Sequence, residues 1–445
     1  MKSKKWMAML LAATMGMSLM ACGDSGTADN SSTDSKGEET ASTAAAENKG
    51  SSSGDANLTI WLAGSGDATS DATYRAIFDS WIEENAPGSS YELSFISWGE
   101  YATKLSVALA SGEGPDIFMS GYGMFGSFQA QDYMLDLSNY IPADWDGYTD
   151  IGSNFLDAGK VGGDIYGLLE PSTRVFMYRK DIAEQNGVTE ADLQLDSLDD
   201  LENLAKKMCV KDGNGNLVMS GLELMTTASG PNDPVQIFSV ISRNEDVSYG
   251  LWDSDGLASF NNDAGIAAMK YIKNLYDEGI SLPSESGDNT SGLVSGLASM
   301  CLTAEAVYGT ANATYPDQIG IVPCTMNSLL IGNFICVNKD TQYADQAVDL
   351  LTYMFSSDSC KKKAEGLGMY TMRDSLKPWY EETFPELATI TEYYDHSYAY
   401  SDTAIPYFNE AITGLRNGME SIMAADADIE VTFADCEAQW NALKQ

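Results

Sequence analysis

The sequence has 445 residues, 44% of them hydrophobic, and its 65 acidic and 25 basic side chains give a formal net charge of −40. A chain this acidic repels nucleic acid and anionic lipid headgroups, which excludes the usual nucleic-acid-binding proteins. The charge says little about a small neutral ligand. The length exceeds what a single hydrophobic core usually organises, so we expect two domains or lobes.

The N-terminus has the features of a signal peptide. Lysines within residues 2–5 precede an apolar stretch, residues 6–20, whose ~15 residues fall short of the ~20 that span a bilayer. The end of the stretch continues into Ala21 and Cys22, and the resulting Leu-Met-Ala-Cys resembles the lipobox of bacterial lipoproteins, where the cysteine is lipidated and becomes the first mature residue. We therefore expect a signal peptide at 1–21 and lipidation at Cys22. The alternative is an ordinary secretory signal with a chance cysteine.

Residues 22–57 differ sharply in composition from the rest of the chain. Between 24 and 57 there is no aromatic residue and no Val, Ile, Leu or Met. Such a segment cannot bury a core, so we expect a disordered tether. With a lipid on Cys22, the tether would hold a globular body, residues 58–445, off the outer face of the cell membrane.

The first part of the body alternates strands and helices. Residues 58–63 are typical of a buried strand, and apolar side chains at 74, 77, 78, 81 and 82 have the spacing of an amphipathic helix that residues 85–88 end. A strand at 92–97, a helix opened by a Ser97–Glu100 capping box and closed at Gly112, and a strand at 116–120 follow. This β-α-β-α-β order predicts a parallel sheet. Ligands of such sheets bind beyond the carboxyl ends of the strands, here at 64–67, Trp98 and 120–122.

Cysteine spacing gives no metal or redox motif. Three of the six cysteines after Cys22 lie in apolar, strand-like surroundings, and no CxxC occurs, so we expect buried free thiols. Residues 212–223 place polar side chains at the positions of an EF-hand loop, but Leu217 stands where the loop needs glycine. The alternative for this segment is an ordinary hairpin turn. The tyrosines at 393, 394, 398 and 400 either pack against a helix or face a ligand.

Several segments, taken in order, resemble one protein family. They are "LTIWLAGSG", "SWGEYATKLSVALASGEGPDIF", "DIYGLLEPSTRVFMYRKDIAEQNGV", "LIGNFICVNKDTQYADQAVDLLTYMFS" and "GLGMYTMRDSL". Together they are similar to the extracellular solute-binding proteins of carbohydrate-uptake ABC transporters, which are maltose-binding-protein-like. Each segment alone is weakly specific, but the ordered set covers essentially the whole body.

The resemblance implies an α/β, type II periplasmic-binding-protein fold with two hinged lobes and a ligand cleft between them. Lobe 1 would be 58–172 plus 335–368, and lobe 2 would be 173–334 plus 369–445. The chain would cross between lobes near 170–174, 332–335 and 366–369. It also implies a lipid-anchored, monomeric receptor outside the cytoplasm, which binds a sugar or oligosaccharide and delivers it to the permease subunits of an ABC importer. No cofactor is expected.

Sugars present hydroxyl groups and flat C–H faces, so their sites combine aromatic rings with charged or amide side chains. The residues at the predicted cleft that offer these groups are Ser65, Asp67, Trp98, Tyr122, Glu170, Arg174, Glu305, Tyr308, Asn333, Phe334 and Tyr370. Structural alternatives are a helix cap for Asp67, core packing for Trp98, Tyr122, Tyr308 or Phe334, and an ion pair for Glu170 with Arg174.

Other functions stay open at this stage. Maltose-type relatives place a tryptophan and an acid after the Gly-Pro-Asp strand, where this chain has Ser120 and Gly123, so the resemblance does not imply maltodextrin as the ligand. A receptor for a polyamine or peptide is one alternative. A sugar-active enzyme with paired carboxylates is another. Against an enzyme, the sequence has no Walker A or HExxH motif, and its one histidine, His396, has no visible partner.

Overall fold

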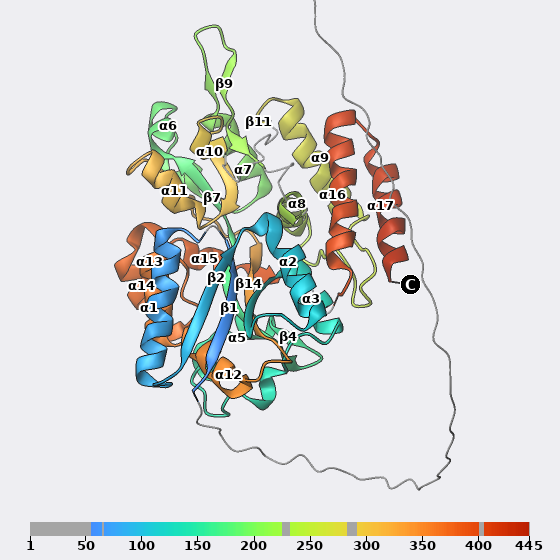
Figure 1. Ribbon diagram of the computed structural model, residues 1–445. Helices are drawn as coiled ribbons and strands as arrows, with labels where there is room; N and C mark the ends of the chain where they lie inside the picture. Colours follow the sequence, from blue (N-terminus) through green and yellow to red (C-terminus); the bar gives the residue numbers. More distant parts are fainter. Residues whose placement is uncertain (1–54, 65, 225–231, 283–291, 400–404, 445) are drawn as a thin grey trace, which may run out of the picture. The chain divides into compact units, whose positions relative to one another are not determined.

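Two main β-sheets organise the protein in the computed structural model, which describes residues 55–64, 66–224, 232–282, 292–399 and 405–444 (Figure 1). The predicted signal peptide, Cys22 and almost all of the predicted tether lie outside these residues. None of the helices in the described part of the chain combines the length and apolar content that crossing a bilayer requires.

The first sheet contains the predicted parallel strands. β1 (Asn57–Ala63) lies between β2 (Ser90–Ile96) and β3 (Ile117–Gly121) and runs parallel to both, which confirms the β-α-β-α-β order. β14 (Ser328–Val337) pairs antiparallel with β3 on one side and with β6 (Leu168–Ser172) on the other. β15 (Ser397–Ala399) runs parallel to the beginning of β14.

The helices after β1 and β2 begin and end close to where the sequence predicts. α1 (Ala68–Glu84) buries Tyr74, Ile77, Phe78 and Trp81, the expected apolar face. α2 (Trp98–Ser111) ends at Gly112, whose φ of 75° suits glycine. The predicted capping box was wrong: Ser97 is the N-cap, but its side chain accepts no capping hydrogen bond. Glu100 instead pairs with Lys104 one turn later, at 2.8 Å.

The second sheet has a mixed strand order. It runs β11 (Ser281–Leu282), β10 (Leu222–Glu223), β12 (Met300–Ala304), β7 (Arg174–Arg179) and β13 (Ile319–Ile321). β10 is parallel to β11 and β12, whereas β7 is antiparallel to both of its neighbours. Two hairpins lie outside the main sheets: β4 (Lys160–Val161) with β5 (Asp164–Ile165), and β8 (Val210–Lys211) with β9 (Leu217–Met219).

The β8–β9 hairpin contains the segment that partly matches an EF-hand loop. The Asp212 carboxylate accepts hydrogen bonds from the backbone N–H groups of Asn214 (2.8 Å) and Asn216 (2.9 Å). These bonds close an ordinary turn, so the hairpin alternative holds. Among the described residues, no group of three His, Cys, Asp or Glu side chains is placed to hold a metal ion.

The remaining helices cover the sheets and fill the connections. They are α3 (Tyr122–Ala130), α4 (Gly147–Asp150), α5 (Ser153–Asp157), α6 (Lys180–Gln185), α7 (Leu198–Met208), α8 (Asn232–Glu245), α9 (Asp263–Asp277), α10 (Gly292–Ser295), α11 (Val307–Thr314), α12 (Ala344–Met354), α13 (Ser357–Leu367), α14 (Lys377–Thr383), α15 (Ile390–Asp395), α16 (Phe408–Ala425) and α17 (Ile429–Leu443). Short 3₁₀ turns are η1 (Leu137–Asn139), η2 (Glu190–Leu193), η3 (Asp374–Leu376) and η4 (Pro385–Leu387). Figure 1 shows α1 and α13 on one side of β1 and β2, and α2 and α3 on the other.

The connections between the two sheets are short. β6 of the first sheet ends at Ser172 and β7 of the second begins at Arg174, so only Thr173 separates them, within the predicted first crossover. The next connection, from β13 to β14, spans residues 322–327. The predicted second crossover at 332–335 lies inside β14 instead. Gly332 is there because β6 approaches closely: a Cβ at this residue would lie 2.1 Å from the Glu170 carbonyl oxygen.

The strand pairing does not test the predicted lobe boundaries fully, but it shows which strands belong to each sheet. β14 continues through residue 334, where lobe 2 was expected to end, and β15 also joins the first sheet. The division into two lobes with the stated bounds therefore stays a prediction. The prediction of buried cysteines outside disulfides is confirmed for Cys301, Cys324, Cys336, Cys360 and Cys436, whereas Cys209 is only partly buried and also forms no disulfide.

Candidate ligand-binding site

Three residues meet at the carboxyl edge of the first sheet. Trp98 begins α2 directly after β2, and its side chain is 47% exposed. A Cβ built on Gly121, the last residue of β3, would lie 3.7 Å from the Trp98 ring and 3.9 Å from the Asn333 amide oxygen. Asn333 lies opposite Gly121 on β14. An open aromatic face and an amide therefore flank a position without a side chain.

Tyr101 gives this edge a fixed base. It is fully buried one turn into α2, and its ring lies edge-on to Trp98 with the centroids 5.8 Å apart. Its hydroxyl lies 2.9 Å from the Trp61 carbonyl and 2.8 Å from the Met119 carbonyl, and it accepts a bond from the Met119 N–H. The start of α2, and with it Trp98, is thus tied to both β1 and β3.

The loop after β1 contributes to the same edge. The Gly64 N–H donates to the Ile96 carbonyl at 2.9 Å, so the loop lies against the end of β2. Asp67 takes the alternative role of a helix cap, because one carboxylate oxygen accepts from the N–H groups of Thr69 and Ser70, both at 3.0 Å. Its side chain is also exposed. The predicted Ser65 lies outside the described residues.

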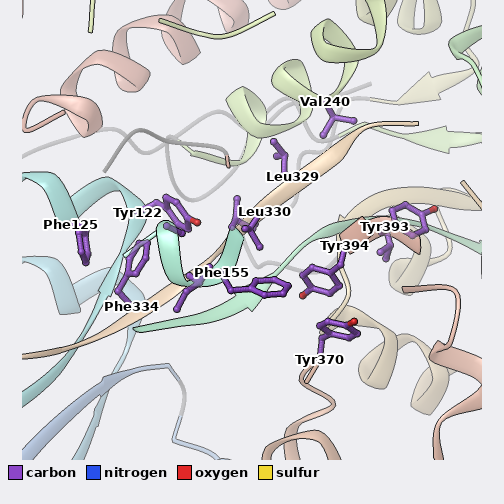
Figure 2. Packing of buried hydrophobic residues seen from close by; sticks show 14 of the residues in the cluster. Tyr122, Phe125, Phe155, Val240, Leu329, Leu330, Phe334, Tyr370, Tyr393 and Tyr394 are labelled. Carbon is purple, nitrogen blue, oxygen red and sulfur yellow. The ribbon is translucent and has the colours of Figure 1, made fainter. Parts of the chain in front are cut away.

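Tyr122 and Phe334 belong to an aromatic cluster in the core. Tyr122 is 7% exposed and its ring centroid lies 4.8 Å from that of Phe334, which is itself fully buried and 4.2 Å from Phe125 (Figure 2). Tyr122 therefore packs in the core in this structure, as the structural alternative predicted, and Phe334 is the ring that it contacts. Burial raises the pKa of Tyr122, and its hydroxyl has no hydrogen-bond partner among the described residues.

Glu170 and Arg174 do not pair with each other. Glu170 forms an ion pair with Lys363 at 2.8 Å and accepts a bond from the Tyr74 hydroxyl at 2.9 Å. The Arg174 guanidinium donates to the amide oxygen of Gln236 in α8. The predicted Glu170–Arg174 ion pair is therefore corrected: the chain turns between β6 and β7, and each side chain finds a partner in a helix.

Glu305 ties the two sheets together at their junction. It follows β12, and one carboxylate oxygen accepts from the Ser172 hydroxyl at 2.8 Å and the Thr173 N–H at 2.9 Å. The other accepts from the Tyr394 hydroxyl at 2.9 Å. Burial outweighs these bonds and raises the pKa of Glu305. Both carboxyl oxygens of Glu305 therefore already bond to protein groups in this structure.

The last two predicted residues are Tyr308 and Tyr370. Tyr308 in α11 is partly buried. Tyr370 is 4% exposed and stacks on Tyr394, with centroids 4.2 Å apart and ring planes 18° apart. Tyr393 and Tyr398 also pack, since Tyr393 donates to the Val322 carbonyl at 2.7 Å and the Tyr398 hydroxyl lies 2.9 Å from that of Ser239. Tyr400 lies outside the described residues.

Of the predicted residues, Trp98 and Asn333 come together at an accessible edge, with the Asp67 loop beside the end of β2. Sequence reasoning missed Gln236 and Lys363, the partners of Arg174 and Glu170. Neither sits in a motif, and both lie on helices far along the chain, so no local pattern could have identified them. Asn333 and Phe334 are neighbours on β14 and face opposite sides of the sheet. Since β14 is buried on both faces along most of its length, alternation does not single out Asn333 as the accessible residue.

Comparisons with known proteins match this architecture. The arabinooligosaccharide-binding protein of Bacillus subtilis (strain 168) is 24% identical over 373 residues, which cover 79% of this chain and 81% of that one. An ABC transporter solute-binding protein from Thermotoga lettingae, bound with α-D-tagatose, superposes with a TM-score of 0.74 at 18% identity over 88% of this chain and all of that one.

A second solved structure gives the same fold. The cyclic α-maltosyl-1,6-maltose binding protein from Arthrobacter globiformis has a TM-score of 0.74 at 19% identity, over 88% of this chain and 99% of that one. The fold is thus the predicted type II arrangement of maltose-binding-like proteins. The family model for bacterial extracellular solute-binding proteins matches residues 83–391, and the chain belongs to that family.

Proposed function

We propose that this protein is a lipid-anchored receptor outside the cytoplasm, which captures a sugar or oligosaccharide between two hinged lobes and delivers it to an ABC importer. Family membership supports capture of a solute rather than its chemical conversion. Its relatives support a carbohydrate as the ligand. One is named for binding arabino-oligosaccharide, one was solved with bound tagatose, and one is named for binding a cyclic maltose derivative. The protein would act as a monomer and release its ligand unchanged.

The observation that best supports a sugar ligand is the half-exposed indole of Trp98 beside the Asn333 amide. A sugar ring can place its C–H face on the indole and share hydroxyl hydrogen bonds with the amide. Gly121 leaves the space between the two groups free of side-chain atoms. The site lies beyond the carboxyl ends of parallel strands, where ligands of open α/β sheets bind.

A thermal-shift panel followed by two variants tests this proposal. A ligand at a hundred times its Kd should add about 2.7 kcal/mol to the unfolding free energy. Trp98→Ala should weaken the binding of the best sugar by on the order of 1–3 kcal/mol, the usual cost of one good contact. It should change the stability of the free protein little, because the ring is 47% exposed.

Tyr140→Ala is the matched control. Tyr140 is also exposed, at 39%. It belongs to the segment after Met134, and Met134 pairs with Asn338 at the amino edge of β3, the edge opposite to the candidate site. The control should keep the affinity of the unmodified protein. Equal affinities for all three proteins would count against Trp98 as part of the site. Stabilisation by spermidine or oligopeptides, with none by any sugar, would favour the non-sugar receptor. Recovery of a cleaved sugar would favour an enzyme.

A further inference from the structure

A pocket of about 360 Å³ lies apart from the Trp98 edge. Its walls come from three segments: the beginning of α5 at residues 152–155, the stretch from Tyr370 to Lys377, and the turn from α15 into β15 at residues 394–397. The Gly152 N–H donates to the Met372 carbonyl at 3.3 Å, and Ile151 pairs with Arg373, so the first two walls are joined. Neither Trp98 nor Asn333 lines the pocket.

Aromatic rings form the apolar part of this pocket. Tyr370 and Tyr394 are stacked, and Phe155 lies 5.8 Å from Tyr394 and 6.5 Å from Tyr370 between ring centroids. Figure 2 shows Phe155, Tyr394 and Tyr370 grouped together, away from Tyr122, Phe125 and Phe334. Three rings gathered at one cavity offer the flat apolar surface that a compact organic molecule can contact.

Both cations of the pocket are already paired with carboxylates. The Arg373 guanidinium is buried and donates to Asp146, Asp150 and the Phe355 carbonyl. The Lys377 ammonium pairs with Asp395 at 2.9 Å. An anionic ligand would have to compete with these carboxylates for both cations, so the lining disfavours an anion, and its aromatic rings suit an uncharged organic molecule.

One polar group of the lining still lacks a partner. Thr371 is 1% exposed, and its hydroxyl has no hydrogen-bond partner among the described residues. A buried hydroxyl without a partner is destabilising, and nearly all such groups in folded proteins are satisfied. The oxygen has almost no accessible surface, so an occupant of the pocket could bond to it only after the Thr371 side chain turned toward the cavity.

We propose that this pocket is a second binding site, for a small neutral polyhydroxyl compound no larger than a monosaccharide. The volume lies near the lower end of the range for small-molecule sites, so it admits one sugar-sized ring and excludes an oligosaccharide. The rings would cover the C–H face of the occupant. The hydroxyls of Thr371 and Ser397 and the carboxylates of Asp374 and Asp395 would bind its hydroxyl groups.

The test uses methyl NMR of the purified protein, with glycerol, D-xylose and D-glucose as neutral probes and D-glucose 6-phosphate as the charged comparison. Met372 lines the pocket and is 3% exposed, so its methyl group is a local reporter, assigned with Met372→Leu. We expect at least one neutral probe to shift this signal saturably at millimolar concentration. The phosphate ester should bind more weakly than D-glucose.

Two pocket variants and one control locate the binding. Thr371→Val keeps the side-chain shape and should weaken the probe roughly threefold to tenfold, the range for one lost hydrogen bond. Asn154→Trp, at the exposed rim of the pocket, should abolish the Met372 shift and leave capture of the transported sugar unchanged. Trp98→Ala should leave the shift intact.

Three results would overturn the proposal. The first is a Met372 signal that no neutral probe moves. The second is a shift that disappears in Trp98→Ala but survives in Asn154→Trp, which would place the probe at the capture site. The third is equal affinity in Thr371→Val, which would mean that the Thr371 hydroxyl takes no part in binding the probe. None of these results bears on the capture of the transported sugar.

Discussion

Lys363 and Glu170 form an ion pair whose side chains are 2% and 1% exposed, with Nζ and Oε1 2.8 Å apart. At an effective dielectric constant of ~20, two unit charges at that distance attract by about 6 kcal/mol. Removing each charge from water costs several kcal/mol, so the intact pair contributes little net stability. Removing one partner is different, because the other charge then stays buried without compensation.

Lys363→Met should therefore lower the free energy of unfolding by about 3–5 kcal/mol. Glu170→Gln should do the same, since it leaves the ammonium unpaired. The double variant Lys363→Met/Glu170→Gln should cost far less than the sum, because it leaves no buried charge. Urea unfolding of the four proteins at neutral pH measures the coupling.

The control is Lys104→Met, which breaks an exposed pair with Glu100 and should change unfolding little. The double-variant comparison also bears on the predicted role of Glu170 in binding. If the ion pair is structural, folded molecules of the double variant keep their sugar affinity. A loss below about 1 kcal/mol in Lys363→Met, or additive losses in the double variant, would refute the reasoning.

Four further outcomes are expected. Phe334→Ala should lower the unfolding free energy by about 3–5 kcal/mol in urea titration, because its ring is fully buried between Tyr122 and Phe125; a loss like that of a surface residue would contradict its place in the core. The raised pKa of Glu305 means that the unfolded chain loses this proton first, so stability should fall as pH rises above the ordinary value of 4.5. Glu305→Gln should remove that part of the decline in unfolding measured across a pH series, and an unchanged pH profile would argue against it. Cys22→Ser should leave the protein uncleaved or released from the membrane, as mass spectrometry of the N-terminus can establish; a native membrane-bound form with an unlipidated N-terminus beyond residue 22 would rule out the anchor. Small-angle scattering should show a smaller radius of gyration with saturating sugar, and an unchanged radius would count against hinge closure.

Local patterns in the sequence predicted the elements that depend on neighbours along the chain. The spacing from Tyr74 to Trp81 gave the buried face of α1, and Gly112 marked the end of α2. These features are encoded within a few residues, so periodicity and turn residues suffice to find them. The capping box was wrong at Ser97, whose side chain makes no capping bond, and Glu100 pairs with Lys104 instead.

Side-chain roles at the candidate site depended on contacts that no local pattern contains. Glu170 looked available for a ligand, but Lys363 lies 193 residues further along the chain and neutralises it. Glu305 similarly meets Tyr394 and the Ser172–Thr173 link only when both sheets have formed. Phe334 is buried next to the partly exposed Asn333 in a strand that is buried on both faces along most of its length, so alternation does not separate the two. Residues whose exposure is set by tertiary packing were therefore the ones that the sequence could not assign.

Calorimetric titration of arabino-oligosaccharides, monosaccharides, spermidine and oligopeptides into the purified protein tests the central claim most directly. Capture of a neutral sugar predicts saturable heat from at least one carbohydrate, with one site whose affinity falls in Trp98→Ala and persists in Tyr140→Ala. Saturable heat from spermidine or a peptide, with none from any carbohydrate, would contradict the account.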